Sequence, residues 1–111
     1  MEQTSLPLVS VLMTTYNHER YLARAVESVL AQQTSFAVEL VLGEDCSTDG
    51  TRALCEAYAA EYPGRVRLVT GSVNIGWRAN YLRTFEACRG KYVATATATT
   101  GGADPQSGSL C

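Results

Sequence analysis

The 111-residue sequence has no long apolar run and no excess of basic residues. Its most apolar stretch near the start, residues 6–13, is far shorter than the ~20 residues that a membrane helix requires. No basic segment precedes that stretch, so we expect neither a signal peptide nor a membrane span. Nine Lys and Arg residues against eleven Asp and Glu residues give a net charge of −2, which supplies no positive field for a nucleic acid. The composition therefore argues against nucleic-acid binding.

Cysteine and histidine are sparse and scattered. The sequence has no C-x-x-C pair among its four cysteines, Cys46, Cys55, Cys88 and Cys111, and its only histidine is His18. This set of residues does not match the spacing of zinc sites. We therefore expect reduced thiols in a cytoplasmic protein. The composition, 46% hydrophobic and 18% charged, is typical of one packed domain.

Strand and helix patterns alternate along the chain. The sequence predicts strands at residues 9–15, 38–42, 65–70 and from 91 onward, and helices at 19–33, 51–62 and 77–88. The first strand is apolar and β-branched on both faces, as in a parallel sheet covered by helices on each side. The third alternates polar and apolar residues, which favours a position nearer the sheet edge. This order predicts a three-layer, doubly wound, mostly parallel α/β sheet.

Polar side chains follow the first two predicted strands. They are Thr14, Tyr16, Asn17, Asp45, Ser47 and Asp49. Because ligands of doubly wound sheets bind at the carboxyl ends of the strands, we expect these side chains to converge on one crevice. A carboxylate there can accept a hydrogen bond from a base or a ribose, but the same residue types also cap helices, and both interpretations stay open. Glu44 either supports this loop or is solvated.

Five segments, in this order, resemble the amino-terminal part of the family 2 glycosyltransferases of the GT-A fold. They are VSVLMTTYN at 9–17, AVESVLAQ at 25–32, ELVLGEDCSTDGT at 39–51, NIG at 74–76 with Asn80, and GKYVA at 90–94. The resemblance implies the nucleotide-binding half of a nucleotide-diphospho-sugar transferase fold over residues 7–94. Residues 1–6 precede this domain and are interpreted as an N-terminal extension. Residues 95–111 have little periodicity, so we expect a disordered tail there.

The resemblance also implies a role for each matching polar residue. Thr14, Tyr16 and Asn17 would belong to a nucleotide pocket, with the Tyr16 ring near the base. Asp45 would accept a hydrogen bond from the base. Ser47 and Asp49 would shape the loop. The partner implied is a nucleotide-sugar donor, with UDP as the expected nucleotide.

Three further residues, Asn74, Gly76 and Asn80, resemble the turn beside the nucleotide in the family. Arg78 has no counterpart there and is equally well explained as a solvated charge. A Rossmann dehydrogenase is disfavoured, because no G-x-G-x-x-G follows the first strand.

One departure from the family concerns its acidic metal motif. Residues 95–102 contain no carboxylate, where such enzymes place the acids that hold Mg²⁺ or Mn²⁺ against the donor diphosphate. We therefore assign no catalytic residue and no metal ligand in this chain, and expect the cation only in intact relatives. The sequence is interpreted as an amino-terminal fragment without transfer activity. A non-catalytic nucleotide-binding or interaction module is the alternative.

The composition of residues 95–102 suggests an origin for this departure. Read one base earlier, their codons permit Tyr-Cys-Asp-Gly-Asp-Asp-Trp-Trp, an acidic and aromatic string of the kind that the family has at this point. We therefore hypothesise a frameshift over these residues, the alternative being a genuine low-complexity tail.

Overall fold

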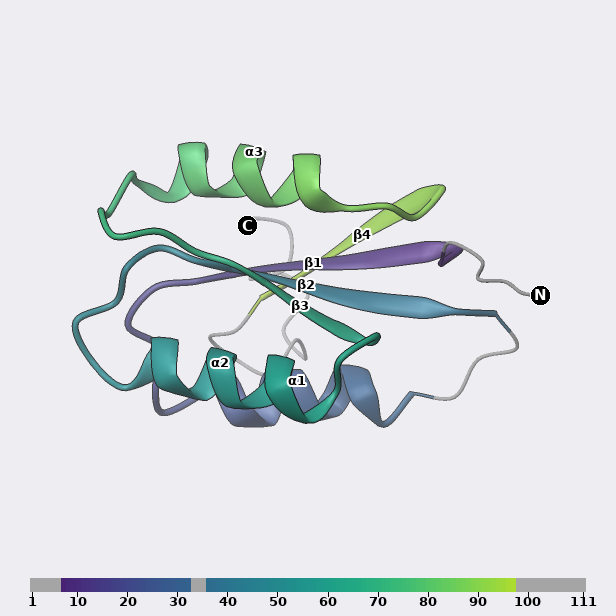
Figure 1. The fold of residues 1–111 in the computed structure, drawn as a ribbon, viewed down its shortest axis with the longest axis horizontal. Coiled ribbons are helices and arrows are strands. Elements are labelled where there is room, and N and C mark those ends of the chain that lie inside the picture. The colour runs from purple at the N-terminus through teal and green to yellow at the C-terminus, as the bar shows by residue number, and fades with distance from the viewer. Residues whose placement is uncertain (1–6, 33–35, 98–111) are drawn as a thin grey trace.

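Strands and helices alternate strictly, as the sequence predicts. The computed structural model describes residues 7–32 and 36–97 (Figure 1). The elements are β1 (Val9–Thr15), α1 (Leu22–Leu30), β2 (Val38–Glu44), α2 (Thr51–Glu61), β3 (Val66–Val69), α3 (Trp77–Ala87) and β4 (Tyr92–Thr97).

The four strands form a parallel sheet in the order β3-β2-β1-β4. Helices α1 and α2 cover one face of this sheet and α3 covers the other (Figure 1). The chain builds outward from β1 to β3, and α3 then carries it back across the opposite face to β4. The predicted doubly wound sheet and the edge position of the third strand are therefore confirmed. The direction of winding reverses between β1 and β4, and ligands of such sheets bind outside the carboxyl ends at that point.

The two faces of the sheet are packed differently. The face under α1 and α2 holds the apolar core, made by Met13, Leu22, Ala25, Val26, Leu40, Leu42, Cys55 and Val66. The face under α3 is more polar, because Asn80 and Thr84 are buried there and the Asn80 side-chain amide donates to the Gly43 carbonyl at 2.8 Å. A Cβ atom at Gly43 would overlap the Thr84 side chain. The glycine in β2 therefore allows the close approach of α3.

Several element boundaries differ from the sequence-based prediction; α1, for example, ends at Leu30 instead of residue 33. Helix α1 begins at Leu22 instead of residue 19, because the preceding residues form a turn in which Asn17 has a φ of 55°. Strand β2 continues to Glu44, whose side chain is fully buried. Strand β4 pairs with β1 as far as Thr97, beyond the domain boundary expected at residue 94.

The predicted N-terminal extension, residues 1–6, lies outside the described residues. So does the predicted tail from residue 98 onward, which includes most of the segment 95–102 for which we hypothesise a frameshift. Among the described residues, β4 pairs with β1 alone, and Leu82 and Phe85 of α3 and Tyr92 of β4 are exposed. No described helix is long and apolar enough to cross a membrane. Of the cysteines in the described ranges, Cys46, Cys55 and Cys88 are all free thiols.

Candidate functional site

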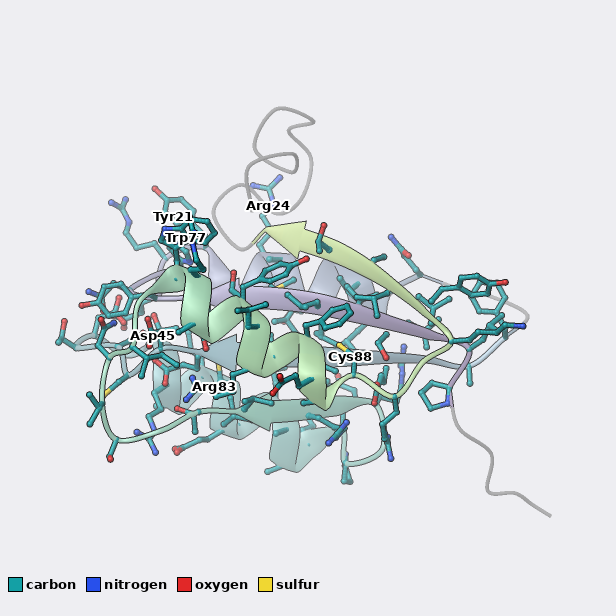
Figure 2. The ribbon with its side chains drawn as sticks, turned by 90° about the horizontal axis from the view of Figure 1, so that it is seen from above. Tyr21, Arg24, Asp45, Trp77, Arg83 and Cys88 are labelled. Atoms are coloured by element: carbon teal, nitrogen blue, oxygen red, sulfur yellow. The ribbon has the colours of Figure 1, made fainter. Side chains whose placement is uncertain are left out.

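A cavity of about 320 Å³ opens at the carboxyl edge of the sheet. Three segments meet there: the end of β1 with its following turn, the residue after β2, and the start of α3. The lining residues are Thr14, Thr15, Tyr16, His18, Asp45, Asn74, Gly76, Trp77 and Asn80. Figure 2 shows Asp45 and Trp77 at the same end of the molecule, away from Cys88 at the far end of α3. Of the six polar residues expected to converge on one crevice, Thr14, Tyr16 and Asp45 line this cavity.

Asp45 joins the β2 end to the turn before α3. Its side chain is buried, and its two carboxylate oxygens accept hydrogen bonds from the backbone N–H groups of Ile75 at 2.8 Å and Gly76 at 3.0 Å. The Asn74 amide donates to the Asp45 carbonyl at 2.9 Å. Since an ionised carboxylate offers about four acceptor positions, the remaining ones can receive a donor from a ligand in the cavity.

His18 is a half-buried member of the cavity lining. Its Nδ1 lies 3.0 Å from the Thr15 hydroxyl and accepts from the Tyr16 backbone N–H at 3.5 Å. Because a backbone N–H only donates, we assign the ring proton of the neutral form to Nε2. Burial lowers the pKa of His18, and the Asp49 carboxylate offsets part of that effect. At neutral pH the ring is therefore uncharged and offers one N–H donor.

Asn17 and Ser47 tie the turn after β1 to the loop after β2. The Ser47 hydroxyl accepts from the Asn17 backbone N–H at 2.9 Å, and Asn17 Oδ1 accepts from the Thr48 backbone N–H at 2.8 Å. The left-handed backbone of Asn17 is tolerated because asparagine visits this region more easily than other non-glycine residues. Both side chains therefore hold the two loops together and do not line the cavity.

Asp49 has a similar structural role at the start of α2. One carboxylate oxygen accepts from the Thr51 backbone N–H at 2.9 Å, and the other from the Glu19 backbone N–H at 3.3 Å. The Glu19 side chain in turn accepts from the Gly50 backbone N–H at 3.1 Å. The N-cap of α2 is Gly50, so Asp49 is not the N-cap that the simpler interpretation of the sequence suggested. Asp49 instead accepts from the first residue of the helix and connects the helix start to the turn before α1.

Glu44 supports the loop after β2 from inside. Its carboxylate is fully buried and accepts hydrogen bonds from the Ser47 backbone N–H and, at 2.7 Å, from the Thr70 hydroxyl. Burial alone raises the pKa of Glu44, but the hydrogen bonds from Ser47 and Thr70 outweigh it and hold that pKa below its usual range. Of the two interpretations left open for Glu44, support of the loop is therefore correct and solvation is not.

Cys46 has a strained backbone, with a φ of 58°. A side chain in this left-handed region costs about 1–2 kcal/mol, whereas glycine adopts it freely. We expect Cys46→Gly to raise the free energy of unfolding by about 0.5–1 kcal/mol, after the greater chain entropy of glycine in the unfolded state is subtracted. Urea unfolding measures this change. Cys46→Ala is the matched control, because alanine removes the thiol and keeps the Cβ atom; equal stability of the two variants would contradict the explanation by strain.

The six residues predicted for the nucleotide site fall into two groups. Thr14, Tyr16 and Asp45 line the cavity, whereas Asn17, Ser47 and Asp49 brace the loops around it. Their contact with a nucleotide stays a prediction. The cavity also contains Thr15, His18 and Trp77, which the sequence analysis did not assign to it. His18 directly follows the matched segment, but the position of Trp77 depends on how α3 crosses the sheet.

The described residues do not form a site for a divalent cation. Within residues 7–32 and 36–97, no three His, Cys, Asp or Glu side chains are grouped so that they could hold a metal ion. Strand β4, which runs beside β1 toward the cavity edge, ends in Thr95, Ala96 and Thr97, and none of these has a carboxylate. The residues present therefore do not fit the acidic metal site that the resemblance implies for intact relatives.

Known proteins are similar to this chain in sequence or in fold. EpsE of Bacillus subtilis is 40% identical over 88 residues, which are 79% of this chain and 31% of EpsE. The structure of residues 1–349 of TarS from S. aureus with UDP-GlcNAc superposes with a TM-score of 0.70 at 25% identity, over 82% of this chain and 26% of that one. The mannosyltransferase PcManGT of Pyrobaculum calidifontis, solved with GDP-Man and Mn²⁺, gives a TM-score of 0.72 at 23% identity, over 86% of this chain and 28% of that one.

The similarity covers most of this chain but only part of each related protein. The chain spans about a third of the length of EpsE and less than a third of each superposed structure. Its sheet and helices superpose on part of the GT-A fold of these structures. The family model for glycosyl transferase family 2 matches residues 10–98, which is most of the sequence. The chain therefore belongs to glycosyl transferase family 2.

Proposed function

We propose that this chain binds a nucleotide-sugar, with UDP as the preferred nucleotide, in the cavity at the carboxyl edge of the sheet, and does not itself transfer the sugar. The observation that carries the proposal is the buried Asp45 carboxylate in a cavity that also has two exposed aromatic rings, Tyr16 and Trp77. A carboxylate accepts the N–H of a uracil ring, and the rings provide stacking surfaces. The structures of TarS with UDP-GlcNAc and of PcManGT with GDP-Man support this class of ligand.

The proposed lack of transfer rests on the metal motif. Sugar transfer from a nucleotide diphosphate needs the charge of the leaving group to be neutralised, and in this family carboxylates bind the cation that does so. Residues 95–102 contain none. We therefore propose nucleotide binding that does not depend on a metal. The free thiols Cys46, Cys55 and Cys88 fit the proposed cytoplasmic location.

The test is a calorimetric titration of the full chain with UDP, with and without Mn²⁺, alongside an assay for sugar release from UDP-glucose. We expect measurable binding whose affinity changes by less than about twofold when Mn²⁺ is added, and no sugar release. Affinity that rises about tenfold with Mn²⁺ would reveal an acidic site and contradict the metal-independent proposal. Measurable transfer to an acceptor would overturn the proposed inactivity.

A non-catalytic nucleotide-binding module is the second candidate. It is favoured by the chain's own hydrogen bonds at the cavity, where the N–H groups of Ile75 and Gly76 donate to the Asp45 carboxylate. The two candidates differ in what happens when a carboxylate is restored. Thr97→Asp should produce Mn²⁺-dependent UDP binding if the cavity is the donor site of a transferase, and should leave binding unchanged in a dedicated module.

A further inference from the structure

Trp77 has an unusual position in the cavity. It is the first residue of α3 and lines the cavity, yet 65% of its surface is exposed. A large indole that is so exposed contributes little to the core, where α3 is anchored by Asn80 and Thr84 instead. The side chain is therefore available for contact with a ligand.

Arg78 covers one face of this indole. Its guanidinium carbon lies 5.3 Å from the centroid of the Trp77 ring, within the range of a cation–π contact. Arg78 does not line the cavity, whereas Trp77 does. The guanidinium therefore restrains the ring from one face, and 65% of the Trp77 surface remains exposed beside the cavity.

The indole of Trp77 shares the cavity with Asp45 and Tyr16. Tyr16 comes from the turn after β1 and is itself 42% exposed. The cavity thus combines a buried hydrogen-bond acceptor with aromatic surface from two separate segments of the chain. A planar ring that donates a hydrogen bond from its edge and stacks through its faces matches this combination, and a nucleobase is such a ring.

We infer that Trp77 is a base-stacking residue of the cavity and that Arg78 is a positioning residue that holds the indole for it. This inference rests on the proposed nucleotide binding and names the residues that recognise the base. It also gives Arg78 a function that the sequence alone did not provide. The base stacks on the indole face opposite the guanidinium, with its edge toward Asp45.

Trp77 is the only tryptophan of the chain, so its fluorescence reports this contact directly. We expect UDP to quench the emission of the full chain in a saturable way, and ribose 5-phosphate, which lacks a base, to leave it unchanged. By calorimetry, Trp77→Ala should bind UDP about tenfold or more weakly, because stacking of one base on an aromatic ring has roughly that value. Trp77→Phe should recover most of the affinity.

Phe85→Ala is the matched control. Phe85 is another exposed aromatic of α3 and does not line the cavity, so its removal should not change the affinity for UDP. Arg78→Ala should weaken binding about two- to fivefold, the range of an exposed cation–π contact, and Arg78→Lys should restore it. UDP binding that leaves Trp77 fluorescence and the affinity of Trp77→Ala unchanged would overturn the inference and leave the proposed nucleotide site standing. Absence of UDP binding by the unaltered chain overturns both.

Discussion

Replacing Asp45 with alanine is expected to weaken UDP binding by about tenfold or more and to lower the free energy of unfolding by about 2–3 kcal/mol. The first effect follows from the loss of the buried acceptor in the cavity. The second follows because the N–H groups of Ile75 and Gly76 lose their charged partner. Calorimetry with UDP and urea unfolding measure the two effects separately.

Asp45→Asn separates the two roles of this carboxylate. The amide oxygen of asparagine can still accept from Ile75 or Gly76, so about half of the stability should return. The charge and the second acceptor are lost, so binding of UDP should stay weak. An Asp45→Ala variant that binds UDP like the unaltered chain would show that the nucleotide, if bound, lies elsewhere.

Glu39→Gln is expected to lower the free energy of unfolding by about 3 kcal/mol at neutral pH. Glu39 is buried in β2, accepts from the Ser10 hydroxyl, and forms an ion pair with Arg89 at 3.0 Å. Glu39 is 1% exposed although Arg89 is 46% exposed, so removal of the Glu39 charge leaves hydrogen-bond donors without their charged acceptor inside the fold. This costs more than the loss of a fully exposed pair. Urea unfolding tests this value.

The effect of Glu39 should depend on pH in a defined direction. Burial alone raises the pKa of Glu39, but the hydrogen bonds from Ser10 and Arg89 outweigh it and keep that pKa below its ordinary value. A carboxyl group with a lowered pKa in the folded state stabilises the fold fully above its unfolded pKa of about 4.3, and less as the pH falls through the folded value. The difference between the unaltered chain and Glu39→Gln should therefore be constant near pH 7 and shrink below about pH 4.

The exposed pair of Arg52 and Glu56 provides a matched control on α2, with the two side chains 40% and 57% exposed. Glu56→Gln should change the free energy of unfolding by less than about 0.5 kcal/mol, because solvent screens such pairs. Equal effects of Glu39→Gln and Glu56→Gln would show that the buried network does not stabilise the sheet.

The sequence predicted the fold better than the element boundaries. Strand β1 matches its predicted range because its residues are apolar on both faces, a pattern that few other elements show. The start of α1 was placed too early because Asn17 and Glu19 look like helix-start residues. Their hydrogen-bonding groups are used instead across the two loops, by Thr48 and Gly50. Such long-range pairing is not visible in local patterns.

The sequence predicted only part of the site, because it reveals the strand ends but not the long-range hydrogen-bond partners. Thr14, Tyr16 and Asp45 follow strand ends, so topology alone brings them to one edge. The burial of Glu44 and the contact of Asp49 with the turn before α1 depend on partners that the sequence does not identify. Trp77 enters the cavity because α3 returns across the opposite face of the sheet, which no spacing rule reveals.

Nucleotide binding at the carboxyl edge is tested most directly by mapping UDP on the full chain through amide chemical shifts in solution. We expect the shifts of Tyr16, Asp45 and Gly76 to change on titration. Those of Val38 and Arg65, which line a separate hollow of about 460 Å³ at the opposite end of the sheet, should not change. Shift changes confined to that opposite end, or no changes at any concentration of UDP, would contradict nucleotide binding at the carboxyl edge.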